Sequence, residues 1–301
     1  MGFVHTRFII LTAAAIVLMS GSDAWAWGPA THIQLASDLL SHLGLLPAGV
    51  AALIAAHRRY FLYGNVATDT VLAKKMSKIK QVCHRWETGF SLLESARTDK
   101  GRAFAYGYLA HLAADTVAHN KFLPRQMAVS RSTIRFGHFY WEVRADALVD
   151  KEHWRLLRRL VRGQYPEPED LLQAHLRATM LSYKTNRVIF KQINLLVTER
   201  AWRQSVEFWA RMSRHTLNAD VIHDYHAESL DRIADLLTRG PASTVLNEDP
   251  NGNASLSYAK AQRRQLRQMK RARIPHGHVI REAAAGHAPV RNRALSLSGE
   301  E

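Results

Sequence analysis

Three potential metal ligands recur at four-residue intervals in the run GYLAHLAADTVAHN, namely His111, Asp115 and His119. A second pair with the same interval, His138 and Glu142, follows in GHFYWEVRAD. Because side chains four residues apart lie on one face of an α-helix, each run points its ligand-type groups in one direction. The spacing therefore predicts two helices that meet at a metal cluster.

The residue types in these runs favour zinc. Imidazole nitrogens and carboxylate oxygens, without a set of thiolates, suit zinc best among the common biological metals, with iron or manganese as weaker options. Helical di-iron bundles use a Glu-x-x-His spacing of three, whereas here the interval is four and histidine is more frequent than glutamate. We therefore expect zinc as the cofactor.

The hydrophobic pattern predicts an all-α fold. Helical periodicity runs through most of the chain and strand-like alternation is scarce. We expect one multi-helix domain from Trp27 to about Val245, built around the metal site. The expected helices cover about 29–43, 48–56, 86–97, 102–118, 137–160, 169–184, 187–215 and 219–238.

The first 26 residues have the features of a secretory signal peptide. Arg7 precedes an apolar run from Phe8 to Met19, and Ala24 and Ala26 form an A-x-A cleavage pattern. That run is too short to span a bilayer, so we expect an exported protein, secreted or periplasmic, with no transmembrane span in the mature chain. Cleavage after Ala26 would give Trp27 a free amino group, which together with its carbonyl could bind a metal.

The charge balance favours polyanionic partners. The chain has 41 Lys and Arg against 26 Asp and Glu, a net charge of +15, which suits phospholipid surfaces, lipopolysaccharide or nucleic acid without choosing among them. We expect residues 246–301 to form a basic, disordered tail, either solvated or in peripheral contact with an anionic membrane. Cys83 is the single cysteine, which excludes an intramolecular disulfide and indicates a small buried hydrophobe.

Further candidate ligands occur at turn-like or helix-start positions. They are Trp27 and His32 in WGPATH, Asp69 in YGNVATDT and His84 in CHRW. With the two helical runs, this ordered set resembles the zinc-dependent phospholipase C family, whose bacterial members begin the mature chain with a ligating tryptophan. The resemblance extends to about residue 146, and the related single-strand-specific zinc nucleases share much of the ligand plan.

The resemblance implies up to three zinc ions. It assigns them three ligand sets, which are the backbone of Trp27 with His32 and Asp115, then Asp69, His84, His111 and the bridging Asp115, and finally His119, His138 and Glu142. One departure is that three residues separate Asp115 from His119, where the best-known family members have five. The shorter spacing keeps His119 on the helical face of Asp115.

The implied activity is phosphodiester hydrolysis by a metal-bound hydroxide, with Asp115 bridging two ions and Asp69 as auxiliary base. We expect a monomeric enzyme of the phospholipase C type that acts on phospholipids. A nuclease or 3′-nucleotidase acting on single-stranded nucleic acid stays open, as does a non-catalytic, zinc-stabilised module that binds membranes. The remaining histidines of the expected domain and tail, His226 and His287 among them, fit no ligand pattern and are interpreted as surface or tail residues.

Overall fold

The computed structural model describes residues 27–70, 81–130, 134–176, 181–197 and 204–289, the last range without 205, 207–210, 212, 214, 216 and 276. Within these ranges the chain is helical and contains no strand, which confirms the all-α prediction. None of the described helices has the length and apolar character that a bilayer span requires. The expected signal peptide lies outside the described residues and stays a prediction.

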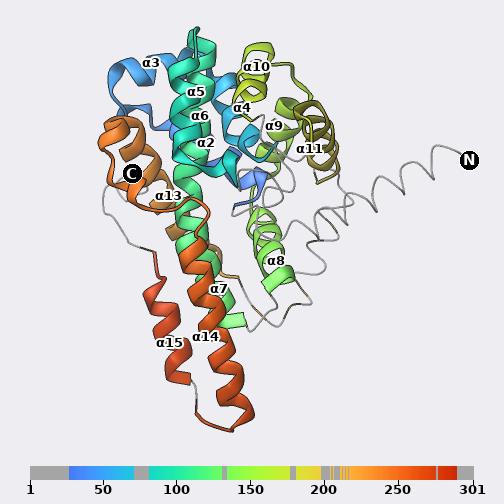
Figure 1. Ribbon diagram of the computed structural model, residues 1–301, viewed down its shortest axis with the longest axis vertical. Coiled ribbons are helices and arrows are strands. Elements are labelled where there is room, and N and C mark those ends of the chain that lie inside the picture. The colour runs from blue at the N-terminus through green and yellow to red at the C-terminus, as the bar shows by residue number, and fades with distance from the viewer. Residues whose placement is uncertain are drawn as a thin grey trace, which may run out of the picture.

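The helices and their bounds are as follows (Figure 1). The α-helices are α2 (Pro29–Ser41), α3 (Ala48–Ala56), α4 (Arg58–Ala67), α5 (Trp86–Ser95), α6 (Asp99–Val117), α7 (Leu123–Ser130), α8 (Ile134–Asp146), α9 (Lys151–Arg162), α10 (Pro166–His175), α11 (Tyr183–Val197), α13 (Ala219–Arg239), α14 (Asn253–Arg271) and α15 (Gly277–Gly286). The shorter turns are η1 (Leu43–Leu45), η2 (Thr68–Thr70), η4 (Val82–His84), η6 (Gly240–Ala242), η7 (Thr244–Asn247) and the π-helical η5 (Ala118–Phe122).

Two differences from the expected helix bounds affect the site. The helix expected over 137–160 is two helices, α8 and α9, because the chain turns after Asp146. The carboxylate of Asp146 accepts a hydrogen bond from the start of α2. Helix α4 was not expected at all. It fills the interval between α3 and η2, and it delivers Asp69 to the site.

Helix α6 is the centre of the fold, and α4, α5 and α13 pack around it (Figure 1). Its first turn is capped by the hydroxyl of Thr98, which accepts a hydrogen bond from the backbone N–H of Gly101. Fifteen of its 19 residues are buried. A helix buried on all sides must lie inside the bundle, so the ligand-bearing residues His111 and Asp115 are held in the core rather than at the surface.

Glycines let α4 and α6 cross in backbone contact. A Cβ atom on Gly64 would lie 2.2 Å from the carbonyl oxygen of Phe104, and one on Gly107 would lie 2.0 Å from that of Phe61. No larger residue fits at either position unless the helices separate. Because His111 follows Gly107 by one helical turn, this crossing brings α4 and its C-terminal neighbour Asp69 to the His111 side chain.

The structure corrects the disorder expected for residues 246–289. Helix α14 buries Leu256, Ala259 and Leu266, and both α14 and α15 pack on α7. Asn120 holds the two ends of this segment, since its amide donates to the carbonyl of Asp249 and its own carbonyl contacts the ring of His287 at 3.1 Å. Packed helices therefore lie on both sides of the boundary expected at residue 245, while residues 290–301 lie outside the described residues.

Candidate metal centre

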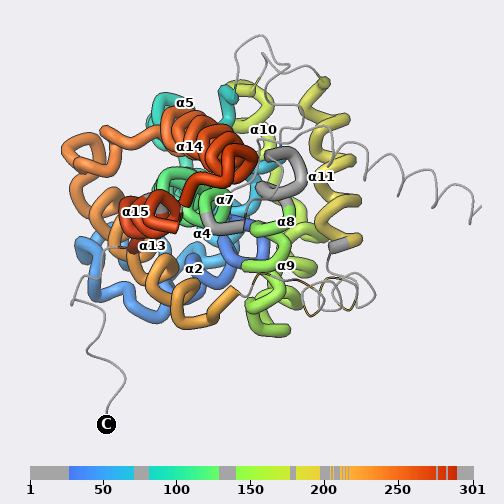
Figure 2. The backbone as a smooth tube through the Cα atoms, turned by 90° about the horizontal axis from the view of Figure 1, so that it is seen from below, coloured from blue at the N-terminus to red at the C-terminus, as the bar shows by residue number. Residues whose placement is uncertain are grey.

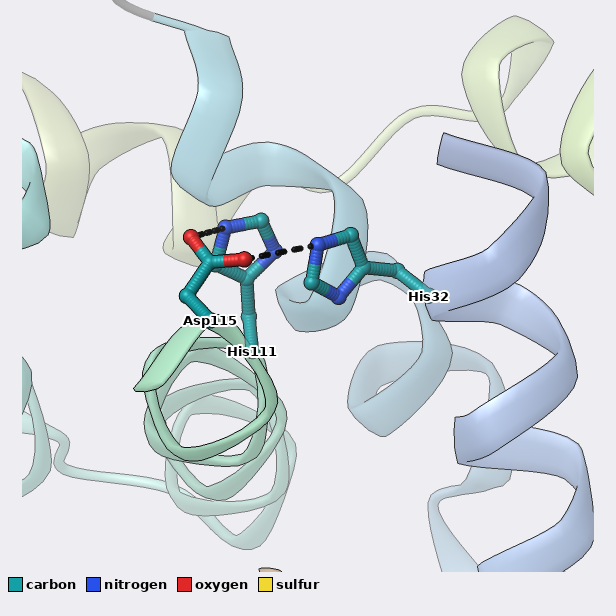
Figure 3. Close-up of side chains that lie close together, drawn as sticks. All are labelled: His32, His111 and Asp115. Carbon is teal, nitrogen blue, oxygen red and sulfur yellow. Dashed lines mark ion pairs between the residues drawn. The ribbon is translucent and has the colours of Figure 1, made fainter. Parts of the chain in front are cut away.

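Three imidazoles surround the carboxylate of Asp115 in the core. Asp115 Oδ1 lies 3.3 Å from His32 Nε2, and Asp115 Oδ2 lies 3.2 Å from the Nε2 atoms of both His84 and His111. Figure 3 shows His32 from α2 reaching one oxygen and His111 from α6 reaching the other. The two oxygens of Asp115 therefore face two different groups of ligand-type atoms, which is the arrangement that a bridging carboxylate needs.

Asp69 adjoins the second of these groups. Its Oδ1 lies 3.4 Å from His84 Nε2 and its Oδ2 lies 3.9 Å from His111 Nε2, while the two imidazole Nε2 atoms are 3.3 Å apart. Among the described residues, two buried sets have ligand atoms within 4.8 Å of one another, namely His32 with His111 and Asp115, and Asp69 with His84 and His111. Figure 3 draws the first set.

The tautomer of His111 indicates that a cation belongs among these atoms. His111 Nδ1 lies 2.8 Å from the carbonyl oxygen of Asn65, which can only accept, so Nδ1 carries the proton. In the neutral ring Nε2 then presents a lone pair to Asp115 Oδ2, which is also an acceptor. Two buried acceptors 3.2 Å apart repel each other unless a proton or a metal ion lies between them.

The charge states fit a metal centre. Burial disfavours the ionised form of Asp115, but the neighbouring His111, His32 and His84 outweigh this and hold its pKa well below the ordinary value. Burial, followed by the proximity of His111, lowers the pKa of His32 against the effect of Asp115. An ionised carboxylate beside a neutral imidazole, as for Asp115 and His32, is the state in which these groups bind metals.

The donor set also fits zinc by chemistry. Both nitrogens of His32 and both oxygens of Asp115 are buried without a hydrogen-bond partner among the described residues, although unpaired buried polar atoms are costly. Imidazole and carboxylate donors in a buried pocket are typical zinc ligands. Cys83 is buried, as expected, and its Sγ lies 3.4 Å from His84 Nδ1.

Side chains from three elements hold η4 and thereby position His84. The hydroxyl of Thr88 donates to the carbonyl of Val82 at 2.6 Å, that of Tyr108 donates to the carbonyl of Cys83, and the amide of Asn251 donates to the carbonyl of His84 at 2.8 Å. Each residue of η4 thus has its backbone carbonyl bound by a side chain. This support fixes the orientation of a ligand on a very short element.

Asp146 fixes the N-terminal end of α2, which bears His32. Its carboxylate accepts hydrogen bonds from the backbone N–H groups of Ala30 and Thr31 and from the Thr31 hydroxyl, at 3.2, 2.9 and 2.7 Å. Burial raises the pKa of Asp146 to about 6, against these hydrogen bonds. Gly28 leaves room for the carboxylate, because a Cβ there would lie 2.2 Å from Asp146 Oδ2.

Trp27 is fully buried just before this helix. Its indole stacks on Phe122, with ring centroids 4.8 Å apart, and meets the ring of His226 edge to face at 5.2 Å. The placement of His226 corrects our interpretation of it as a surface or tail residue, since it is 7% exposed. Burial, with smaller effects from His223 and His32, lowers its pKa to about 3.

Two of the three residues expected to hold a third ion have described side chains. His119 and Glu142 are both buried, but neither belongs to the two convergent sets. His119 lies in the π-helical η5, where its Nδ1 is 2.6 Å from the carbonyl oxygen of Pro250, so a metal ion would bind through its Nε2. The side chain of His138 lies outside the described residues. A third ion held by His119, His138 and Glu142 stays a prediction.

Sequence reasoning missed residues that support the ligands, among them Asn65, Asp146, Pro250 and Asn251. One of them had a detectable signal, because Asp146 continues the four-residue interval of His138 and Glu142 and so repeats the spacing of His111, Asp115 and His119. The others act from loops or through backbone carbonyls, for which the sequence carries no pattern.

The comparisons with known proteins agree with this geometry. Residues 31–207 match the family model described as zinc dependent phospholipase C. Because the match covers more than half of the chain and includes His32, Asp69, His84, His111 and Asp115, the protein belongs to the zinc-dependent phospholipase C family. No curated protein and no solved structure matches the chain. Membership confirms the resemblance seen in the sequence and supports a phosphodiester hydrolase that depends on zinc.

Proposed function

We propose that this protein is an exported, zinc-dependent phospholipase C that cleaves the glycerol-side P–O bond of phospholipids. The observation that carries the proposal is the convergence of three histidines and Asp69 around the buried carboxylate of Asp115. Membership of the zinc-dependent phospholipase C family supports phospholipids as the substrates. The products are diacylglycerol and a phosphorylated head group.

We assign the ligands by the contacts of the two oxygens of Asp115. Asp115 Oδ1 with His32 would hold one ion, and Asp115 Oδ2 with Asp69, His84 and His111 a second. When bound, zinc supplies Lewis acidity, which lowers the pKa of a coordinated water and neutralises charge on the phosphate. The backbone of Trp27 completes the first set in this proposal, and His119, His138 and Glu142 hold a third ion.

Groups of the protein itself fix the tautomer of a ligand and accept a proton during the reaction. The Asn65 carbonyl keeps His111 in the tautomer that leaves Nε2 facing the pocket. Asp69, whose Oδ2 lies 3.9 Å from His111 Nε2, accepts the proton of the attacking water. As the new P–O bond forms, the bond to the glycerol oxygen breaks, and that oxygen leaves as an alcohol after taking up a proton.

The proposed location follows from the leader-like segment of residues 1–26. A secreted or periplasmic enzyme meets lipid surfaces, and the net charge of +15 favours approach to anionic ones. We expect the enzyme to act as a monomer.

The test combines zinc analysis with a substrate panel. Purified protein should contain at least two zinc ions and should release diacylglycerol from phosphatidylcholine. Asp115→Asn should lower kcat/KM by on the order of 1,000-fold, since metal-assisted charge stabilisation amounts to several kcal/mol. Asp99→Asn, an exposed change on the same helix, is the matched control and should retain full activity.

Three outcomes would overturn the proposal. Faster turnover of single-stranded DNA than of phosphatidylcholine at equal zinc would make the protein a nuclease. Bound zinc without hydrolysis of any phosphodiester would make it a zinc-stabilised binding module. Undiminished turnover by Asp115→Asn would remove the bridging carboxylate from the mechanism.

A further inference from the structure

Helices α14 and α15 and the turn between them form a strongly basic hairpin, which we call the basic hairpin (residues 253–286). Its sequence contains eight Lys and Arg but one acidic residue, Glu282. The hairpin extends from one end of the helical body, and the two helices lie side by side in both views (Figures 1 and 2). This region therefore concentrates positive charge on a projecting part of the molecule.

The packing of α14 leaves its charges in solvent. The face toward α7 buries Leu256, Ala259 and Leu266, which recur at helical spacing. The rest of the basic hairpin carries six exposed cations, which are Arg264, Arg267, Lys270, Arg271, Arg273 and Arg281. None of these six forms an ion pair with an acidic side chain among the described residues, so their charge is available to an anionic partner.

The turn adds an apolar contact to this charge. Ile274 is 49% exposed, directly after Arg273 and followed by the exposed Pro275. Basic residues around an exposed aliphatic side chain suit the interface of an anionic bilayer, where phosphates bind the cations and the apolar group enters the head-group region. A single-stranded nucleic acid would instead need several aromatic side chains for stacking, and the basic hairpin contains one aromatic residue, Tyr258, which lies before the six exposed cations in the chain.

We propose that the basic hairpin is the surface by which this protein docks on anionic phospholipid bilayers. The choice of a bilayer as partner rests on the proposed function, but the docking itself requires no catalysis. The base of the hairpin adjoins the metal centre, because the carbonyl of Pro250 and the amide of Asn251, just before α14, contact His119 and the His84 backbone. Docking therefore brings the catalytic domain to the lipid surface through a segment that touches the site.

The experiment measures sedimentation of the full mature protein with vesicles of phosphatidylcholine and phosphatidylglycerol, and with vesicles of phosphatidylcholine alone. The test variant combines Lys270→Gln, Arg271→Gln and Arg273→Gln. The matched control combines Lys151→Gln, Arg155→Gln and Arg159→Gln, which removes the same charge from exposed positions of α9. Zinc content, helicity and turnover of a water-soluble phosphodiester verify that both variants are intact.

Wild-type protein should bind the anionic vesicles and release them at high salt. Each basic residue near an anionic bilayer strengthens binding about fivefold, so the test variant should bind on the order of 100-fold more weakly. The control variant should bind nearly as tightly as the wild type. Ile274→Ser should weaken binding by a smaller factor that salt does not change.

Equal losses in the two triple variants would show that net charge, not the hairpin, determines binding and would overturn the inference. Wild-type protein that fails to bind anionic vesicles would overturn it as well, as would tighter binding of single-stranded DNA that the hairpin substitutions abolish. Because sedimentation reads no turnover, a protein that hydrolyses no phospholipid but docks through the hairpin would refute the proposed function and leave this inference standing.

Discussion

The metal centre and the basic hairpin differ in the sign of their charge and in their burial. At the centre, Asp115, Asp69 and the lone pair of His111 converge in the core and require a cation. In the hairpin, cations project into water and suit an anion. Burial makes uncompensated charge costly, whereas solvent and salt screen exposed charge. Loss of the partner should therefore destabilise the centre and leave the fold of the hairpin unchanged.

Removal of zinc should have the largest effect on stability. Ligands that bind the folded state alone stabilise it by about 4 kcal/mol when they are present at a thousand times their Kd. Chelation should lower the free energy of unfolding by about this amount, as measured by urea denaturation with and without free zinc. The triple variant at Lys270, Arg271 and Arg273 should lose the same amount on chelation. If the chelator leaves the urea unfolding curve unchanged, zinc does not stabilise the folded protein and this expectation is wrong.

The helix crossing behind the centre gives the next largest effect. Gly107→Ala places a methyl group 2.0 Å from a backbone oxygen that cannot move without separating α4 from α6, so we expect a loss of about 3 kcal/mol in urea denaturation. Gly49→Ala is the matched control on α3, where a Cβ meets nothing within 4 Å. That substitution should stabilise the protein slightly. Equal behaviour of the two variants would mean that the helices do not cross in backbone contact.

Asp146 tests whether a distant carboxylate maintains the centre. Asp146→Ala leaves the N–H groups of Ala30 and Thr31 without partners, which should cost about 2 kcal/mol and weaken zinc retention. Asp150→Ala removes the same charge from the start of α9, where the side chain makes no capping hydrogen bond. Thermal unfolding should show a larger loss of stability for Asp146→Ala than for Asp150→Ala, and dialysis should show a larger loss of zinc. Comparable losses in the two variants would mean that the effect comes from net charge.

The smallest effect concerns pH. His226 has a folded-state pKa of about 3 against an ordinary value of 6.5, so below pH 6.5 the unfolded chain binds more protons than the folded one. The stability due to neutral His226 is therefore complete above 6.5 and is lost as the pH falls toward 3. One pH unit below 6.5 the loss should be about 1.4 kcal/mol.

His226→Phe should remove the pH dependence of stability that is due to His226. The wild type and the variant are both titrated in the presence of chelator, so that zinc release cannot contribute. His278→Phe, at an exposed position, is the control and should follow the wild type. A variant at residue 226 whose stability falls as steeply with acid as that of the wild type would contradict the burial of a neutral imidazole.

The part of the site that could be predicted is the part that depends on local periodicity. The interval between His111 and Asp115 specifies a helical face without reference to the rest of the fold. The supporting residues Asn65 and Asn251 depend on which loops and carbonyls the tertiary structure places beside a ligand, and no sequence pattern encodes that. The order of α14 was missed because the buried Arg263 interrupts its thin apolar stripe and gives the helix the composition of a solvated tail.

The contacts of Pro250 and Asn251 bear on when the protein becomes functional during its synthesis. They join residues 131 and 167 positions apart in the chain, so the ribosome completes the ligands of the centre long before it makes their supports. A nascent chain that ends before Pro250 carries every proposed ligand, yet His119 and the backbone of His84 lack these two partners. Secure metal loading is therefore a late event in biogenesis, and a truncated chain should emerge as an inactive precursor rather than as a smaller enzyme.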